Sequence, residues 1–232
     1  MSAIKRRLRS AVKDGCGRQL GSSKMQEISA LKHLCGILWI ATYLLAIRRG
    51  YLDRSYGIPA IAIIMNIAWE IYDGFFTDRS IMRGYGIAWL VLDLFVLYQM
   101  IAFHSRLRQT AMLKYSAMSI LGIVAYFMVL IYDSRYQIRF FITAFFQNAV
   151  MSLLFIHMIL SRKDLRGQSF YIALFKLAAT GTVILGILIH DGMTVKPIYY
   201  PIFLTILGAD IIYAILCLSY AKKSSVTVWT RI

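Results

Sequence analysis

Three acidic residues stand inside stretches of sequence that are otherwise apolar. Glu70 lies in NIAWEIYDGFF, Asp93 in GIAWLVLD, and Asp210 in a third apolar run near the end of the chain. An ionisable side chain at membrane depth costs free energy, so it marks a functional site by default. A carboxyl group kept away from water favours its neutral form and can then donate a proton as a general acid. These residues therefore predict proton-transfer chemistry inside a bilayer.

Polar and aromatic side chains accompany the first two acids at helical spacing. Asn66 lies one turn before Glu70 and Trp89 one turn before Asp93, and each pair shares a helix face. At 1.5 Å per residue, Glu70 and Asp93 lie ~9 and ~12 Å from the loop that joins their segments. Trp69 is the immediate neighbour of Glu70. Because an aromatic face stabilises a cation placed over it, tryptophans beside buried acids suit carbocation chemistry.

Two later segments place polar groups at a comparable depth. Gln147 lies ~11 Å and Asp210 ~18 Å from loops on the same side of the membrane, with Tyr213 one turn deeper. Agreement in depth across four segments predicts one polar cavity. The catalytic candidates are Glu70, Asp93 and Asp210, and the candidates for substrate binding are Asn66, Trp69, Trp89, Gln147 and Tyr213.

Polar side chains inside a membrane bundle also have roles that involve no reaction. Amide side chains hydrogen-bond neighbouring helices together. Lys176 could pair with one of the carboxylates or extend its ammonium towards the membrane surface. The alternative function is a small proton-coupled transporter or channel that uses the buried carboxylates. It leaves the tryptophans beside the acids unexplained, and a purely structural protein leaves the acids themselves unexplained.

The composition is that of a membrane protein. Of the 232 residues, 59% are hydrophobic, and the mean hydropathy is +0.63, whereas a soluble domain is usually about 45–50% apolar. Seven apolar segments are each long enough, at ~20 residues, to cross the hydrocarbon core. Short loops make neighbouring helices antiparallel. The sequence predicts an all-α, integral membrane bundle of seven transmembrane helices over residues 29–47, 57–76, 85–104, 114–132, 140–160, 169–189 and 198–219.

The bundle is expected to occupy residues 29–220, between a basic N-terminal tail (1–28) and a short C-terminal tail (221–232). In the first tail, Ile4, Leu8 and Val12 repeat every fourth position among basic residues. That pattern suits a helix on the membrane surface, with a disordered arm as the alternative. The net charge of +15 lies mostly between the apolar segments. Such loops indicate topology and contact with anionic lipids, and we expect no nucleic-acid partner.

Motifs for metal-dependent and cofactor-dependent chemistry are missing from the sequence. It has no DDxxD or NDxxD cluster to hold Mg²⁺ for diphosphate ionisation. It also has no HExxH, P-loop or Rossmann glycine motif. We therefore expect neither a metal site nor a cofactor.

Three short motifs occur at defined places: NxxWE in the second segment, WxxxD in the third and DxxY in the seventh. Together they resemble the integral-membrane terpene cyclases of fungal meroterpenoid and indole-diterpene pathways, of the pyripyropene and paxilline type. The basic tail is similar to the bacterial branch, of the drimentine type, which acts on prenylated indoles. The resemblance implies that Glu70 and Asp210 are the essential acids, with Asp93 as a partner or alternative donor.

The resemblance also implies a reaction. The acid protonates an alkene or epoxide of a prenyl chain, expected to be farnesyl, on an indole-containing or other prenylated substrate, and ring closure follows without a metal ion. The expected partners are this small molecule and membrane lipids. The expected location is the bacterial cytoplasmic membrane, as a multi-pass protein. The sequence leaves open the ring product, the choice between alkene and epoxide, the membrane orientation and the oligomeric state.

Overall fold

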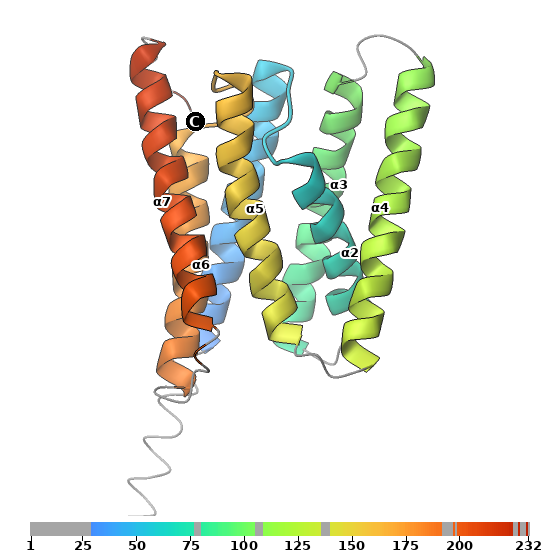
Figure 1. Ribbon diagram of the computed structural model, residues 1–232, viewed down its shortest axis with the longest axis vertical. Helices are drawn as coiled ribbons and strands as arrows, with labels where there is room; N and C mark the ends of the chain where they lie inside the picture. The colour runs from blue at the N-terminus through green and yellow to red at the C-terminus, as the bar shows by residue number, and fades with distance from the viewer. Residues whose placement is uncertain are drawn as a thin grey trace, which may run out of the picture.

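The computed structural model describes residues 29–76, 80–104, 109–135, 140–191, 197, 199–224, 227 and 231. Within these ranges the chain forms helices and no strands, so the predicted all-α bundle is confirmed. The helices lie side by side along one axis (Figure 1). They are Ser29–Asp53, α2 (Ala60–Phe76), α3 (Ser80–His104), α4 (Gln109–Arg135), α5 (Phe140–Arg162), α6 (Phe170–Asp191) and α7 (Tyr199–Lys223). The predicted surface helix in residues 1–28 lies outside the described residues.

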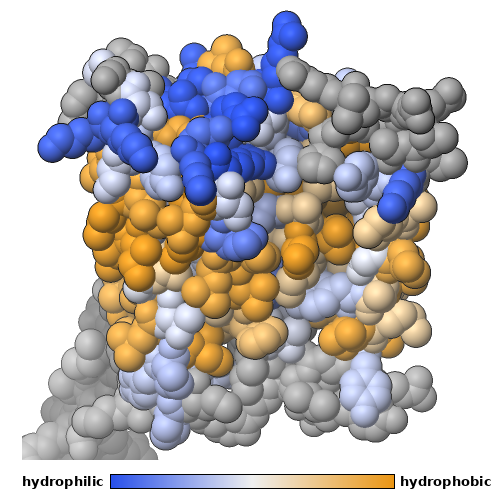
Figure 2. Space-filling view, turned by 45° about the horizontal axis from the view of Figure 1, so that its top comes forward, coloured by the Kyte–Doolittle hydropathy of each residue, from blue (hydrophilic) through white to orange (hydrophobic). Residues whose placement is uncertain are grey.

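The outer surface of the bundle is apolar along most of its length. Six of the described helices are long and apolar enough to cross a membrane, whereas α2, with 17 residues, is shorter. Leu121 on α4 and Leu204 on α7 are 70% and 72% exposed. Figure 2 shows this apolar belt below a hydrophilic cap at one end of the molecule. A large exposed apolar surface suits lipid rather than water, so the bundle is built to lie in a bilayer.

The first helix is longer than the sequence predicts. The predicted segment ends at residue 47, before Arg48-Arg49-Gly50, but the helix continues to Asp53. Arg49 forms an ion pair with Asp53 one turn later, which supports the added turn. The helix ends where Arg54 takes a left-handed backbone conformation with φ 48°. The loop of residues 54–59 then leads into α2.

Asp53 joins three segments at this charged end of the bundle. It accepts hydrogen bonds from Arg49, from the backbone N–H of Gly167 at 2.8 Å and from Arg231 at 2.7 Å. Gly167 has φ 75° and lies against Tyr56, so close that a Cβ atom there would be 2.4 Å from the Tyr56 carbonyl oxygen. The loop after α5 is thereby fixed to the loop before α2.

Helices α2 and α3 pack closely together, and they carry two of the acids. A Cβ atom added at Gly86 of α3 would lie 3.9 Å from the Cα atom of Gly74 of α2. Small residues at a helix crossing let two backbones approach. Helix α2 also contacts α4 and α5, and its Asn66, Glu70 and Asp73 are buried. The shortest helix thus presents its polar face to the bundle interior.

Candidate active site

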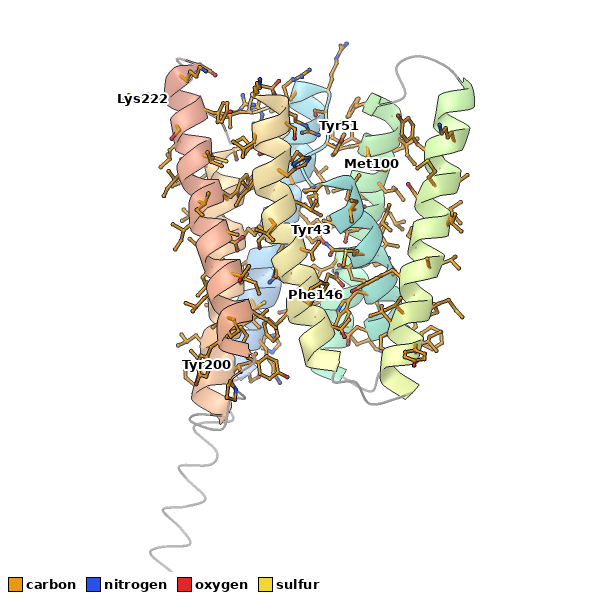
Figure 3. All side chains as sticks on the ribbon, in the orientation of Figure 1. Tyr43, Tyr51, Met100, Phe146, Tyr200 and Lys222 are labelled. Atoms are coloured by element: carbon orange, nitrogen blue, oxygen red, sulfur yellow. The ribbon has the colours of Figure 1, made fainter. Side chains whose placement is uncertain are left out.

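Glu70 and Asp93 meet in the bundle interior. Glu70 comes from α2 and Asp93 from α3, and their side chains are 4% and 0% exposed. The hydroxyl oxygen of Tyr43, from the helix Ser29–Asp53, lies 2.7 Å from Asp93 Oδ2 and 3.5 Å from Glu70 Oε1. Figure 3 shows Tyr43 inside the bundle at about half its height. One hydroxyl group therefore contacts two buried carboxyl groups at membrane depth.

Two amides extend this contact into a chain of hydrogen bonds. Asn66 Nδ2 donates to the Tyr43 oxygen at 2.9 Å, and Gln147 Nε2 on α5 donates to Asn66 Oδ1 at 2.8 Å. The Tyr126 hydroxyl on α4 donates to Gln147 Oε1 at 3.0 Å. Five helices therefore contribute to one assembly, which we call the Tyr43 network: Tyr43, Asn66, Glu70, Asp93, Tyr126 and Gln147.

Each carboxyl group of this network has one oxygen that accepts no hydrogen bond from the described residues. Glu70 Oε2 and Asp93 Oδ1 are buried and have no hydrogen-bond partner in the part of the chain that the structure describes. Two buried carboxyl groups in one site repel each other strongly when both are ionised, so the pair is expected to hold a proton. An acid beside a carboxylate is the arrangement needed to give one proton and take another.

Asp210 lies in a second polar group rather than in the Tyr43 network. Its Oδ1 atom accepts a hydrogen bond from Lys176 Nζ, and both side chains are fully buried. Lys176 also donates to Ser152 Oγ at 2.7 Å, and its ammonium lies 5.6 Å from the centre of the Phe155 ring. Tyr213 packs on Phe155, with ring centroids 4.9 Å apart. The expected single cavity is therefore divided into two polar groups among the described residues.

The two tryptophans of the sequence motifs occupy different places. Trp69 packs with a cluster of Ala68, Tyr72 and Leu130 that faces α4. Trp89 packs against the main core and stacks on Tyr85, with ring centroids 6.0 Å apart. Trp89 is thus the motif tryptophan that belongs to the same apolar core as Tyr43.

The sequence did not point to Tyr43, Tyr126 or Trp39. The Trp39 ring lies 6.3 Å from the Tyr43 ring and 6.0 Å from Lys176 Nζ, so it stands between the two polar groups. Aromatic residues in an apolar segment are common core residues, and no acid in the segment of Tyr43 marked it. The sequence feature that could have indicated Tyr43 is its position one turn after Trp39. This spacing places two aromatic side chains with polar ends on one helix face.

Neither polar group is a metal cage. Among the described residues, no group of three or more His, Cys, Asp or Glu side chains is arranged to hold a metal ion. The Tyr43 network supplies two carboxyl groups, and its other members are hydroxyls and amides that already hydrogen-bond one another.

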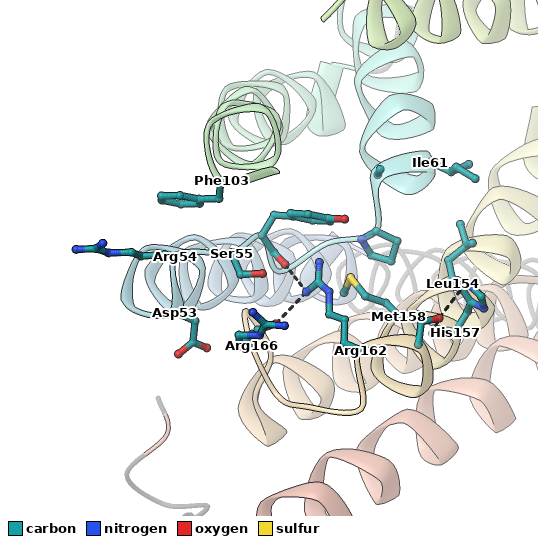
Figure 4. Close-up of a pocket in the computed structure, with 14 residues that line it drawn as sticks. Asp53, Arg54, Ser55, Ile61, Phe103, Leu154, His157, Met158, Arg162 and Arg166 are labelled. Atoms are coloured by element: carbon teal, nitrogen blue, oxygen red, sulfur yellow. Dashed lines mark hydrogen bonds between the residues drawn. The ribbon is translucent and has the colours of Figure 1, made fainter. Parts of the chain in front are cut away.

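A hollow of about 550 Å³ lies at the charged end of the bundle that contains Asp53. Figure 4 shows the side chains that line it. Arg54, Arg162 and Arg166 line it together with apolar side chains such as Ile61 and Leu154. Arg162 donates to the backbone carbonyls of Tyr56 and Arg166, each at 2.9 Å. None of the residues that line this hollow belongs to the Tyr43 network.

Comparison with known proteins identifies the family. The family model of the Pyr4-like transmembrane terpene cyclases matches residues 22–224, a range that contains all the helices described above. The chain belongs to this family. The resemblance inferred from the three short motifs of this Pyr4-like protein is thereby confirmed.

Several fungal proteins are similar to this Pyr4-like chain. The Pyr4-family terpene cyclase mfmH of Annulohypoxylon moriforme is 29% identical over 143 residues, which cover 58% of this chain and 59% of mfmH. Terpene cyclase pyr4 of Aspergillus fumigatus is 36% identical over 70 residues, or 29% of each chain. Asnovolin H synthase nvfL of Aspergillus novofumigatus is 25% identical over 179 residues, covering 74% of this chain and 71% of that protein. No solved structure matches the chain.

Proposed function

We propose that this protein is a membrane-bound terpene cyclase that protonates and cyclises the prenyl chain of a lipophilic substrate without a metal ion. The observation that carries the proposal is the buried pair of Glu70 and Asp93, joined through Tyr43. Membership of the Pyr4-like family favours this function over a proton-coupled transporter. The matches span 59%, 26% and 29% of the first three relatives' lengths, so the activity is inferred from the site as well as the family.

The proposed reaction is a redistribution of bonds within one molecule. The carboxylic acid of Glu70 gives its proton to the terminal carbon–carbon double bond of a farnesyl group, and a C–H bond and a tertiary cation form. The π electrons of the next double bond attack the cation and close a ring, and a second closure follows. A carboxylate takes the final proton, so the product is an isomer of the substrate and no oxidant or reductant is consumed.

Aromatic and amide groups have separate parts in this proposal. Trp89 and Trp69 are proposed to border the chain and support the cation through their ring faces, whereas Tyr213 packs on Phe155 in the second polar group. Asn66 and Gln147 already hydrogen-bond each other, so we assign them to positioning Tyr43 rather than to direct substrate contact.

The finer identity of the substrate follows from the family resemblance of the bacterial type. We propose a farnesylated indole, cyclised to a drimane-like bicycle by an enzyme of the bacterial cytoplasmic membrane, although the compared relatives are fungal. A substrate that partitions into lipid explains why the acids lie at membrane depth.

The test is to incubate membranes containing the protein with a farnesylated indole and with its terminal epoxide. We expect an isomer of equal mass from the alkene, absent from membranes carrying Glu70→Gln at equal protein level. Failure of both compounds to give an isomer, with the folded protein present, would contradict the proposed function.

A further inference from the structure

The hydrogen bonds of the Tyr43 network run in one direction. Amide N–H groups donate and amide oxygens accept, so the orientations of the Asn66 and Gln147 amides set the direction of the chain. Tyr126 donates to Gln147, Gln147 to Asn66, and Asn66 to the Tyr43 oxygen. The Tyr43 oxygen therefore already accepts one hydrogen bond, and its own proton points out of the chain, towards the carboxyl groups.

Tyr43 has a single hydroxyl proton to give, and two carboxyl groups are within reach. Asp93 Oδ2 is at 2.7 Å, the usual length of an O–H···O hydrogen bond, whereas Glu70 Oε1 is at 3.5 Å. The proton therefore goes to Asp93. Hydrogen bonds to a charged acceptor are shorter and about twice as strong as neutral ones. The chain of donors thus stabilises an ionised Asp93 more than an ionised Glu70.

We infer that Tyr43 is a positioning residue that decides which carboxyl group of the pair keeps the proton. With Tyr43 in place, Asp93 is the carboxylate and Glu70 is the acid, and Glu70 Oε2 is the atom that holds the transferable proton. The role of Glu70 as the proton donor in catalysis rests on the proposed function. The assignment of the proton to Glu70 rather than Asp93, which we call the protonation pattern, does not.

The surrounding groups agree with this division. Asp73 lies one turn from Glu70 on the same face of α2 and is also buried, so a third acid lies on the Glu70 side of the pair. The ammonium of Lys176 is bound to Asp210 and Ser152 in the second polar group. Among the described residues, the ionisable group that hydrogen-bonds to the pair is therefore Tyr43, and the ammonium of Lys176 is bound elsewhere.

The test is infrared spectroscopy of the protein in lipid, because a protonated carboxyl group has a C=O stretching band that a carboxylate lacks, and no turnover is needed. We expect Glu70→Gln to remove one such band and Asp93→Asn to leave it. Adding Tyr43→Phe to Glu70→Gln should restore a band, because Asp93 then loses its donor and takes up a proton. Tyr220→Phe, a partly buried tyrosine of α7 outside the network, is the matched control and should restore nothing.

Two results would overturn the inference. One is loss of the band in Asp93→Asn and its retention in Glu70→Gln. The other is an unchanged spectrum when Tyr43→Phe is added to Glu70→Gln. If Tyr43→Phe fails to fold, Tyr126→Phe is the substitute, because it removes the first donor of the hydrogen-bond chain. It should shift the frequency of the Glu70 band without removing the band. An unshifted band would also overturn the inference.

Turnover gives a second and separable readout. We expect Tyr43→Phe to lower kcat by roughly 10²-fold, because Glu70 then shares its proton with Asp93 and general-acid catalysis weakens, with little change in KM. The infrared bands can follow the expected pattern even if no tested substrate is cyclised. That combination of results would refute the proposed reaction and leave the protonation pattern of Glu70 and Asp93 intact. A normal kcat in Tyr43→Phe would show that the hydroxyl does not govern the acid.

Discussion

Replacing Asp210 with asparagine leaves the ammonium of Lys176 without its counter-charge in the bundle interior. Both side chains are fully buried, and Lys176 Nζ is bound by Asp210 and by Ser152 Oγ. The family resemblance implies that Asp210 is an essential acid, whereas its contacts describe a counter-ion. The two roles predict different turnover for a variant in which Lys176 and Asp210 are both replaced.

The contacts of Lys176 and Asp210 determine how much stability each substitution is expected to cost. Breaking a buried ion pair by removing one partner typically costs about 3–5 kcal/mol, because it leaves an uncompensated buried charge. Replacing both partners with apolar residues of similar volume is often neutral or stabilising by about 1–4 kcal/mol. Ser152 also donates to the backbone carbonyl of Asn148 at 3.0 Å, so its hydroxyl stays satisfied when the ammonium is lost.

The assay is a double-mutant cycle of Asp210→Leu, Lys176→Met and the variant that combines the two, with Asp210→Asn measured beside them. The free energy of unfolding would be measured in mixed micelles by titration with SDS, and turnover in membranes. We expect each single variant to lose about 3–5 kcal/mol and the double variant to recover most of that loss. Ser152→Ala, which removes an uncharged ligand of the ammonium, should cost only about 1 kcal/mol.

Turnover of the double variant separates the two roles. If Asp210 is a counter-ion, the stable double variant should cyclise substrate within about tenfold of the wild type, while Glu70→Gln stays inactive. A double variant that is as stable as the wild type and yet inactive would refute the counter-ion assignment and return Asp210 to the proton-transfer machinery.

Metal dependence, the two motif tryptophans and one loop glycine give three more predictions. Activity in membranes should survive EDTA, since the proposed initiation uses a carboxylic acid, and strict dependence on Mg²⁺ would point to diphosphate ionisation instead. Trp89→Ala should release monocyclic or early-deprotonated products in a larger share than Trp69→Ala, because Trp89 belongs to the core that contains Tyr43 and Trp69 faces α4; equal product profiles would contradict this. Gly167→Ala should lower stability by about 1–3 kcal/mol, because its φ of 75° and its contact with the carbonyl of Tyr56 leave no room for a Cβ atom. Gly208→Ala on α7, where nothing lies within 4 Å of an added Cβ, is the control and should unfold at or above the wild-type temperature.

Much of the fold was predictable because it depends on the length and order of the apolar runs in the sequence. Long apolar runs of bilayer length define helices, and six of the predicted segments recur as apolar helices of at least 18 residues. The error at residues 48–50 has a simple cause. Two arginines and a glycine are typical of a loop, but the i,i+4 ion pair of Arg49 with Asp53 extends the helix by a turn.

The pairing of Glu70 with Asp93 could also be predicted, since adjacent antiparallel helices place residues of equal depth side by side. The position of Asp210 could not. Depth along a helix does not fix the direction in which a side chain points, and helix α5 separates the two polar groups. Its neighbouring residues Met151 and Ser152 point about 100° apart around the helix, and they contact Asn66 and Lys176 respectively.

Tyr43 was unpredictable for a related reason. By sequence its phenol ring is that of an ordinary core residue. Its hydroxyl gains a role because side chains from α2 and α3 reach it in the folded bundle. The direction of the hydrogen-bond chain depends on the rotamers of Asn66 and Gln147, which no spacing rule supplies.

The most direct test of the central claim, that a buried carboxylic acid protonates a prenyl carbon, is turnover of a farnesylated indole in D₂O. If Glu70 transfers its exchangeable proton to the terminal double bond, the product should carry one deuterium at the ring position derived from the terminal isopropylidene end of the chain, and Glu70→Gln should give no product. A cyclised product without deuterium at that position, or turnover restricted to the epoxide, would contradict the account.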